Sequence, residues 1–360
     1  MEKLHHIASQ FCFEAPIQEI QSLGEGFIND TFVVLTTDEK LKYILQRKNK
    51  TIFTQVPEMM SNILAVIDHI KKKIIARGGD PLREAMTVIQ TQDGKPYFID
   101  SDGEFWASCL FIQGSVSVDK ADSLELCYKG GVGIGQFQTD LIDFEQPLYE
   151  TIKGFHNIRW RFTQWDEALK VDAAGRVKEL REEIEWIESR KTQMLNFWKL
   201  VEDGDIPTRV THNDTKLSNV LFDQDNNVLC MIDLDTVMSS TSLNDFGDAI
   251  RSYANTGAED ERDLSKVSMD FDRFEAYMQG YLSKRKENIT PLEIEYLAFS
   301  AIYITYEQVL RFLMDYINGD TYYKIHYADH NLVRTHAQYA LLQSMEAQHD
   351  KMKQFVKATI

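Results

Sequence analysis

Residues Val210–Leu221 read VTHNDTKLSNVL, and Met231–Asp235 shortly after them read MIDLD. The two stretches contain a carboxylate at Asp214, an amide five residues later at Asn219, and a second carboxylate, Asp233, at the end of an apolar run. Transfer of a phosphoryl group to a hydroxyl uses this set, because a carboxylate orients the acceptor while oxygen ligands hold Mg²⁺ beside the nucleotide phosphates. The stretch therefore predicts a phosphoryl-transfer site between short strands.

Each of these side chains has an expected role. Asp214 would orient the acceptor hydroxyl and take its proton, and Lys216 would reach the transferring phosphoryl group. Asn219 and Asp233 would hold Mg²⁺, which prefers a few protein oxygens plus nucleotide phosphates to an all-protein cage. An ordinary polar turn is the alternative, since Asn and Asp are common in turns. Turn chemistry explains neither the Asp-x-Lys-x-x-Asn spacing nor an acidic pair on an apolar strand.

The rest of the chain has two kinds of apolar pattern, one before and one after about residue 113. The first hundred or so residues read as short strands separated by turns such as Asp93-Gly94 and Asp102-Gly103, which suit tight antiparallel corners. The expected strands are Ile17–Leu23, Thr31–Thr37, Leu41–Arg47, Thr87–Thr91, Tyr97–Asp100 and Glu104–Ile112. One helix is expected over Pro57–Ile70, where apolar residues recur with a period of roughly 3.6 residues.

After Gln113-Gly114 the apolar pattern becomes helical. The expected long helices are Ser123–Leu141, Glu179–Val201, Phe271–Leu282, Pro291–Ile317 and Asn331–Val356. Short strands are expected only around the polar stretch, at Arg209–Thr211, Asn219–Leu221 and Val228–Leu234. We predict an α+β protein with an antiparallel, β-rich N-terminal nucleotide-binding lobe over residues 1–113 and a mainly α-helical C-terminal lobe over 114–360, which carries the catalytic loop and the acceptor site.

The motifs resemble those of the kinase-like phosphotransferases, which include aminoglycoside phosphotransferases and choline kinases, and more closely those of the bacterial N-acetylhexosamine 1-kinases. The phrases that carry the resemblance are Tyr43–Gln46, Thr211–Leu217, Ile232–Thr236, Asp245–Asp248 and His330–Thr335. The resemblance extends over the full length and implies a two-lobed protein-kinase-like fold whose cleft binds Mg·ATP. It also implies that Asp214 is the base, that Asn219 and Asp233 bind the metal, and that the acceptor is the C1 hydroxyl of N-acetylglucosamine or N-acetylgalactosamine.

Two glycine pairs invite a phosphate-binding interpretation. Gly24 and Gly26 lie in a turn between strands, a context that favours a lid over the ATP phosphates; a plain glycine-rich hairpin turn is the alternative. Gly131 and Gly135 lie four residues apart within an expected helix, so we predict that they allow close helix packing instead.

Two further positions concern the nucleotide. Gln46, followed by Arg47, stands where the third strand of a protein kinase offers its phosphate-binding lysine, so the nucleotide is expected to be held differently in that corner. Phe111 and Ile112 close the N-terminal lobe and would form a hinge that offers backbone groups to adenine, which is compatible with an ordinary buried last strand.

The tripeptide Asp245-Phe246-Gly247 spells the metal-binding motif of protein kinases, but its spacing argues against that role. Asp245 lies 31 residues after Asp214, whereas Asp233 lies 19 residues after it, close to what a loop and one hairpin need. We therefore expect Asp245 and Asp248 to cap the following helix and to hydrogen-bond the catalytic loop.

Glu307 and Arg311 are the charged residues of the apolar stretch Tyr303–Leu313. At i, i+4 they could pair with each other. The alternative is that Arg311 faces the acceptor and hydrogen-bonds sugar hydroxyls or phosphate with its planar fork. The resemblance to sugar kinases favours this second interpretation.

Composition excludes several other functions. Of 360 residues, 39 are Lys or Arg and 56 are Asp or Glu, so the net charge of −17 disfavours nucleic-acid or membrane-surface binding. The four cysteines form no C-x-x-C pair, which argues against a zinc site or a disulfide framework and suits a reducing cytoplasm. The first residues lack the apolar run typical of a signal peptide, and no stretch reaches about 18 uninterrupted apolar residues. A cytoplasmic protein with a small-molecule acceptor is expected.

Two alternatives remain at this point. The acceptor could be choline or an aminoglycoside, although a site for a cation would need an aromatic cage or acidic residues that the sequence alone does not place. The chain could instead be a non-catalytic pseudokinase, but Asp214, Asn219 and Asp233 are all intact, and a degenerate site would be expected to lose one of them.

Overall fold

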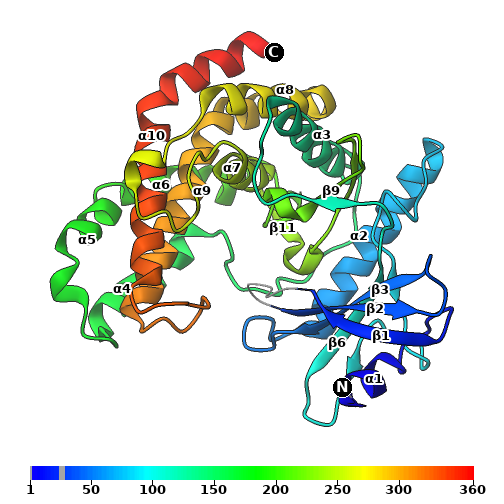
Figure 1. Ribbon diagram of the computed structural model, residues 1–360. Coiled ribbons are helices and arrows are strands. Elements are labelled where there is room, and N and C mark those ends of the chain that lie inside the picture. The colour runs from blue at the N-terminus through cyan, green and yellow to red at the C-terminus, as the bar shows by residue number, and fades with distance from the viewer. Residues whose placement is uncertain (1, 24–28) are drawn as a thin grey trace. The chain divides into compact units, whose positions relative to one another are not determined.

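The computed structural model describes residues 2–23 and 29–360 (Figure 1). Contacts between Cα atoms divide the chain into two compact units. Unit 1 comprises residues 1–116, 143–152 and 221–238; unit 2 comprises residues 117–142, 153–220 and 239–360. Asp214 and Asn219 therefore belong to unit 2, whereas Asp233 belongs to unit 1.

Unit 1 is built on an antiparallel sheet with the strand order β1-β2-β3-β6-β4, and β5 also pairs with β6. The strands are β1 (Ile17–Ser22), β2 (Asp30–Thr36), β3 (Lys42–Lys48), β4 (Val88–Ile89), β5 (Phe98–Ile99) and β6 (Phe105–Leu110). All six lie within or at the edge of the predicted ranges, so the β-rich N-terminal part of the fold is confirmed. The turn residues between the strands were the signal that predicted them.

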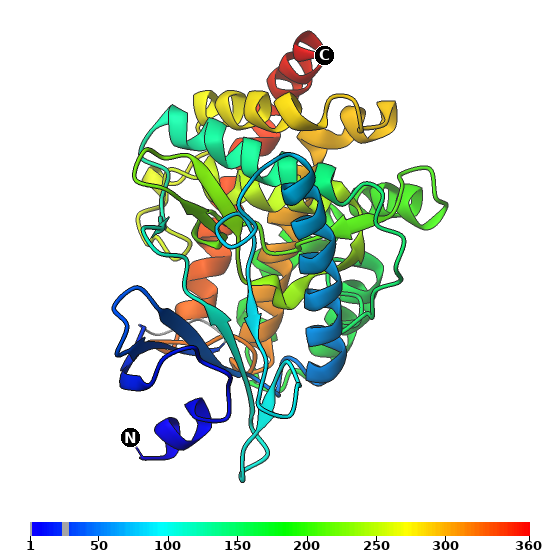
Figure 2. The same cartoon turned by 90° about the vertical axis from the view of Figure 1, so that its right-hand side faces the viewer.

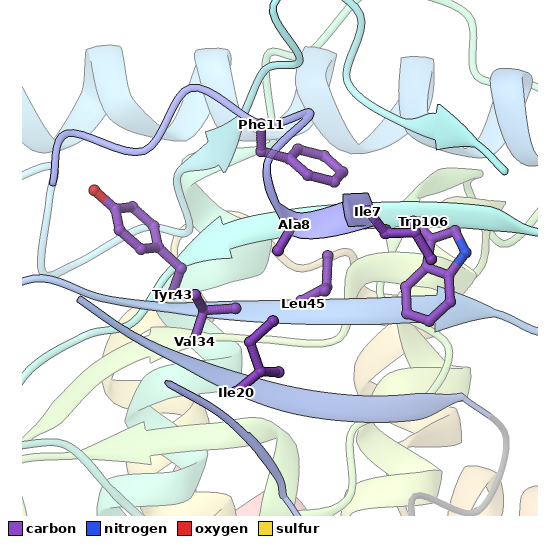
Figure 3. Close-up of a cluster of buried hydrophobic side chains, with 8 residues drawn as sticks. All are labelled: Ile7, Ala8, Phe11, Ile20, Val34, Tyr43, Leu45 and Trp106. Atoms are coloured by element: carbon purple, nitrogen blue, oxygen red, sulfur yellow. The ribbon is translucent and has the colours of Figure 1, made fainter. Parts of the chain in front are cut away.

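One face of this sheet packs on a helix that the sequence did not suggest, α1 (Glu2–Ala8). Tyr43 and Leu45 of β3 are buried on this face, together with Ile7 and Ala8 of the helix (Figure 3). Since side chains alternate along a strand, Gln46 and Lys48 belong to the opposite face of the same strand. β3 thus contributes apolar residues to the core and polar residues to the other side of the sheet.

Helix α2 (Val56–Ala76) extends past the predicted end at Ile70, because Ile74 is still buried one turn further on. Its Asn62 side chain joins the three chain segments of unit 1. The amide of Asn62 donates to the carbonyls of Tyr149 (2.9 Å) and Val237 (3.1 Å), and its oxygen accepts from Tyr149 N (2.9 Å). A single buried polar residue therefore ties residues 143–152 and 221–238 to the N-terminal part.

Unit 2 is mainly helical, as predicted. Its helices are α3 (Leu124–Asp140), α4 (Ile158–Val171), α5 (Arg181–Glu188), α6 (Lys191–Glu202), α7 (Ser242–Tyr253), α8 (Phe271–Arg285), α9 (Pro291–Ile317) and α10 (His330–Thr359). The long helices α9 and α10, orange and orange-red in Figure 2, pack along each other. Among the described residues, no helix is both long enough and apolar enough to cross a membrane.

The prediction of one helix over Glu179–Val201 is wrong, because the chain forms α5 and α6 with a break at Arg190. The Arg190 guanidinium donates to the Glu346 carboxylate of α10 (2.6 and 2.8 Å) and to the carbonyl of Trp186 (3.1 Å). This tertiary ion pair ends α5 at a point where the apolar periodicity continues.

The glycines of α3 pack as predicted. A methyl group on Gly131 would clash with the backbone oxygen of Tyr277 on α8, and one on Gly135 would lie 2.7 Å from the oxygen of Tyr281. Gly280 of α8 is equally close to the backbone of α3. These glycines let two helices approach closely (Figure 1), and this packing accounts for them without a phosphate site.

Short strands flank the polar stretch. They are β8 (Arg209–Thr211), β9 (Val220–Phe222), β10 (Val228–Met231) and β11 (Met238–Ser240), with the two-residue β7 (Val116–Ser117) pairing with β9. The predicted strands around Asp214 are confirmed. Residues 212–219, between β8 and β9, form the loop that is predicted from the sequence to be catalytic, and it is called the catalytic loop below.

Candidate active site

The catalytic loop brings three of the predicted site residues together. One carboxylate oxygen of Asp214, Oδ2, accepts from Nζ of Lys216 (2.9 Å) and from Nδ2 of Asn219 (2.9 Å). The same Nδ2 donates to the backbone oxygen of Asp214 (2.8 Å). The Asp-x-Lys-x-x-Asn spacing therefore forms a compact hydrogen-bonded group in unit 2.

Asp214 is an ionised carboxylate in these surroundings. Burial favours the neutral acid, but Lys216, His212 and the amide of Asn219 outweigh burial and lower the pKa of Asp214 below its usual range. The side chain is 28% exposed, so a hydroxyl group can reach it. Such a carboxylate can accept a hydrogen bond from an acceptor hydroxyl and orient it.

Helix α7 holds the catalytic loop through hydrogen bonds to its backbone. The two oxygens of Asp245 accept from the backbone N–H groups of His212 (3.0 Å) and Asn213 (2.8 Å), and Asp248 accepts from Thr215 N (2.8 Å). The expected hydrogen bonds to the catalytic loop are confirmed. The expected capping role is wrong, since Thr241 caps α7 and both aspartates lie inside the helix.

Asp245→Asn should lower stability more than it changes the Mg²⁺ requirement. The carboxylate accepts from two backbone amides and from Gln138 (3.1 Å), and a carboxamide has one acceptor oxygen for these buried donors. A buried donor left unpaired costs about 1–3 kcal/mol. Urea unfolding and a Mg²⁺ titration of turnover measure the two effects, with Asp263→Asn, an exposed N-cap, as the control. A large shift in the Mg²⁺ titration at unchanged stability would contradict the supporting role.

In unit 1 a second polar group forms around Asp235. Its oxygens accept from Nζ of Lys48 (2.8 Å to each) and from Nδ2 of Asn29 (2.8 Å). Lys48 also donates to Oε1 of Gln46 (2.7 Å), and the side chains of Lys48 and Asp235 are only 4% and 5% exposed. Gln46 is therefore the neighbour of a buried lysine.

Lys48 was not predicted from the sequence, because Gln46 stands where the phosphate-binding lysine was expected. A signal was available, since residues i and i+2 of a strand share a face, and Lys48 follows Gln46 by two residues on β3. Its pairing with Asp235 needed the tertiary structure.

Asp233 lies two residues after the end of β10 and has a left-handed backbone (φ 59°), which Asp adopts more easily than most residues. A short 3₁₀ turn (Leu234–Thr236) follows it. Burial, opposed by Lys48 and assisted by Asp235 and Asp233, raises the pKa of the Cys109 thiol to about 11. The charges of Lys48, Asp235 and Asp233 all act on this thiol of β6.

The chemistry of the predicted metal ligands suits Mg²⁺. The hydrogen bonds that Asn219 donates use Nδ2, so its carboxamide oxygen is the atom that it can offer to a cation. Asp233 offers a carboxylate. Across residues 2–23 and 29–360 no cluster of three or more His, Cys, Asp or Glu side chains has a metal-binding arrangement. Such a cluster is not required here, because Mg²⁺ that is bound with a nucleotide needs only one or two protein carboxylates.

In the predicted hinge, Phe111 and Ile112, one backbone group is already hydrogen-bonded within the sheet. Phe111 N donates to the carbonyl of Lys42 (2.9 Å), so this amide serves the sheet. Ile112 is buried and packs with Leu221 and Cys230 in an apolar cluster. Gly24 and Gly26 lie outside the described residues.

Arg311 lies among aromatic rings on α9. Its guanidinium is 5.1 Å from the ring centroid of Phe155, 5.7 Å from Tyr322 and 5.6 Å from Tyr323, and it donates to Gln308 Oε1 at 3.4 Å. Glu307 is not hydrogen-bonded to Arg311; it accepts instead from His156 (2.7 Å) and Arg161 (3.2 Å). The i, i+4 pair considered from the sequence is therefore not formed.

The loop that carries Tyr322 and Tyr323 is anchored by Asp315. This buried carboxylate accepts from the backbone N–H groups of residues 321, 322 and 323 at 2.8–3.0 Å and from the side chain of Asn331 (2.9 Å). Arg334 donates to Asn331 (3.0 Å) and to the carbonyl of Lys324. The phrase His330–Thr335 thus positions the aromatic residues beside Arg311.

Helix α4, which packs against α9 (Figure 1), contributes Arg161 and was also missed. Its signals were an N-cap at Asn157 and the apolar spacing Ile158, Phe162, Trp165. Arg311 was therefore predicted from the sequence without the side chains that surround it.

The profile of the phosphotransferase enzyme family (APH) matches residues 19–273. The chain belongs to this family. The superfamily resemblance inferred from the motifs is confirmed.

Solved structures of similar fold agree with the family. The phosphotransferase is similar to the microcompartment-associated aminopropanol kinase, with 16% identity over 98% of each chain and a TM-score of 0.66. It is also similar to an aminoglycoside phosphotransferase from Alicyclobacillus acidocaldarius (14% identity, 98% of this chain and 96% of that one, TM-score 0.62). A third is spectinomycin phosphotransferase in complex with ADP and spectinomycin (14%, 99% and 98%, 0.56). These likenesses confirm the predicted kinase-like fold.

Proposed function

We propose that this phosphotransferase transfers the γ-phosphoryl group of ATP to the C1 hydroxyl of N-acetylglucosamine or N-acetylgalactosamine in the cytoplasm. Asp214, Lys216 and Asn219 support catalysis, because their side chains are hydrogen-bonded to one another in the arrangement that phosphoryl transfer uses. A pseudokinase has no need to retain this group.

Asp214 would act directly on the acceptor. Its ionised carboxylate accepts a hydrogen bond from the acceptor hydroxyl, fixes the direction of attack and takes the proton as the new P–O bond forms. Asn219 holds this carboxylate in place, and Lys216 neutralises part of its charge and would contact the transferring phosphoryl group.

Other residues would bind the nucleotide. Asn219 and Asp233 would hold Mg²⁺, which supplies neutralisation of charge on the phosphates when bound. The backbone around Phe111 and Ile112 would contact adenine, with the apolar cluster of Ile112 beneath the ring. Gln46 on β3, together with Gly24 and Gly26, would contact the phosphates.

The side chains around Arg311 favour a neutral acceptor over a cationic one. Arg161 and Arg311 both act on the carboxylate of Glu307, and burial together with the neighbouring Arg311 lowers the pKa of Arg161. A cationic acceptor placed here would be repelled by two arginines. The rings that could cage an ammonium group already contact the Arg311 guanidinium. This observation favours a sugar over choline or an aminoglycoside.

An acceptor panel tests this proposal. ADP release with Mg·ATP should be fastest with N-acetylglucosamine or N-acetylgalactosamine, slower with galactose or glucose, and negligible with choline, homoserine and kanamycin. A site that hydrogen-bonds the N-acetyl group is left with unpaired buried partners when that group is missing. Faster ADP release with choline or kanamycin would overturn the choice of acceptor.

Arg311→Lys refines the same test. Lysine keeps the charge but loses the planar fork, so kcat/KM for the N-acetyl sugar should fall by about tenfold to a hundredfold. Arg159→Lys, which alters an exposed arginine paired with Glu202, is the matched control and should leave kcat/KM unchanged.

A further inference from the structure

The peptide group that joins Asn213 to Asp214 is held at both ends by histidines. Its carbonyl, on Asn213, lies 3.1 Å from Nε2 of His156, and its N–H, on Asp214, lies 3.3 Å from Nδ1 of His212. Asn213 has a left-handed backbone (φ 64°), a conformation that needs support from its surroundings. The direction of the Asp214 side chain depends on this peptide.

His156 must donate from both of its ring nitrogens. A peptide carbonyl only accepts, so Nε2 carries a hydrogen. Nδ1 lies 2.7 Å from Oε2 of Glu307, whose other oxygen accepts from Arg161. Two arginines, Arg161 and Arg311, favour the ionised form of this carboxylate whatever the charge of the ring. An ionised carboxylate also only accepts, so Nδ1 carries a hydrogen too.

The ring has no access to a replacement partner. The side chain of His156 is 6% exposed, and the ring of Phe155 lies against it with a centroid distance of 4.5 Å. Water therefore cannot supply a hydrogen bond that the ring gives up.

The charged and titratable groups near the ring come from three elements. They are Glu307, Arg311 and Tyr303 on α9, Arg161 on α4, and His212 and Asp214 on the catalytic loop. Tyr303 donates to the backbone oxygen of His156 (2.8 Å), which fixes the residue itself. Glu307 is the partner that stabilises a charged ring.

We propose that His156 is a buried imidazolium that fixes the Asn213–Asp214 peptide and is thereby a positioning residue for Asp214. Glu307 supplies the negative charge that keeps both ring nitrogens protonated. The kinetic part of the test rests on the proposed function, whereas the protonation state does not.

His156→Gln should lower kcat by about tenfold to a hundredfold, the penalty for a misplaced reacting group. The KM values for the acceptor and for Mg·ATP should change by less than about twofold, because His156 contacts neither in this account. His336→Gln is the matched control: His336 also lies 2.9 Å from a glutamate, Glu183, in the same unit, but does not contact the catalytic loop. It should leave kcat unchanged. A folded His156→Gln protein with normal kcat would overturn the proposal.

Two measurements on the protein without substrate complete the test. In histidine-labelled wild type at neutral pH, ¹⁵N NMR should show both His156 ring nitrogens protonated, with the signals assigned by their loss in His156→Gln. Amide hydrogen exchange over residues 212–216 should be faster in His156→Gln than in wild type or His336→Gln. A neutral His156 ring in wild type would overturn the inference.

Glu307→Gln keeps the inference testable if His156→Gln fails to fold. The amide can still accept from Nδ1 or donate to it, but it no longer stabilises a charged ring, so His156 should become neutral while retaining one N–H. A ring that stays doubly protonated in this variant would contradict the role of Glu307. If wild type phosphorylates none of the acceptors, the proposed function fails, and the ring and exchange measurements still decide this inference.

Discussion

Asp214→Asn should lower kcat by about 10²- to 10⁴-fold, the usual worth of a general base. The carboxamide preserves the shape of the side chain, but it has only one acceptor oxygen and it cannot take the proton. The lower half of the range is expected, because proton transfer comes late in a loose phosphoryl-transfer transition state.

Nucleotide binding should survive this change. In the proposed site Asp214 faces the acceptor and not adenine, so stabilisation of the variant against heat by Mg·ATP should match that of wild type. Asp203→Asn, which alters an exposed aspartate paired with Lys199, is the control and should change neither measurement. Near wild-type turnover in Asp214→Asn would mean that another residue is the base. Loss of binding of both ligands would mean that Asp214 is structural.

Asp233→Ala and Asn219→Ala should each reduce turnover at low millimolar Mg²⁺ to a hundredth of wild type or less, since each removes an oxygen ligand from the proposed metal site. The two variants should differ at high Mg²⁺. Asn219 also holds the Asp214 carboxylate through its Nδ2 group, and added metal cannot replace that hydrogen bond. Raising Mg²⁺ should therefore restore more activity to Asp233→Ala than to Asn219→Ala.

A Mg²⁺ titration of ADP release in both variants measures this difference. Undiminished turnover of Asp233→Ala at low millimolar Mg²⁺ would show that the metal has been assigned to the wrong carboxylate. Equal recovery of both variants would show that the contact of Asn219 with Asp214 has no role in turnover.

Local sequence signals predicted most of the fold. The strands of unit 1 lie between turn residues such as Asp93-Gly94, and α9 runs from Pro291 to Ile317 as its apolar pattern indicates. The failures have tertiary causes. The helix predicted over Glu179–Val201 is divided at Arg190, whose partner, Glu346, lies 156 residues further along the chain. No local periodicity carries the information that these two residues meet.

The same distinction applies to the candidate site. The spacing of Asp214, Lys216 and Asn219 within one loop was sufficient to predict that they act together, and their hydrogen bonds agree with it. Lys48 and His156 could not be assigned in this way. Their partners, Asp235 and Glu307, are distant in sequence, so their importance follows from burial and from hydrogen bonds that only a folded chain forms.

The product of the reaction tests the central claim most directly. Wild-type protein would be incubated with Mg·ATP and N-acetylglucosamine or N-acetylgalactosamine, and the phosphorylated sugar would be examined by ³¹P and ¹H NMR. The account predicts a phosphate whose phosphorus couples to the anomeric proton, formed with one ADP per sugar and absent with Asp214→Asn. A phosphate at C6, or phosphorylation of choline or kanamycin while both N-acetyl sugars remain unchanged, would contradict it.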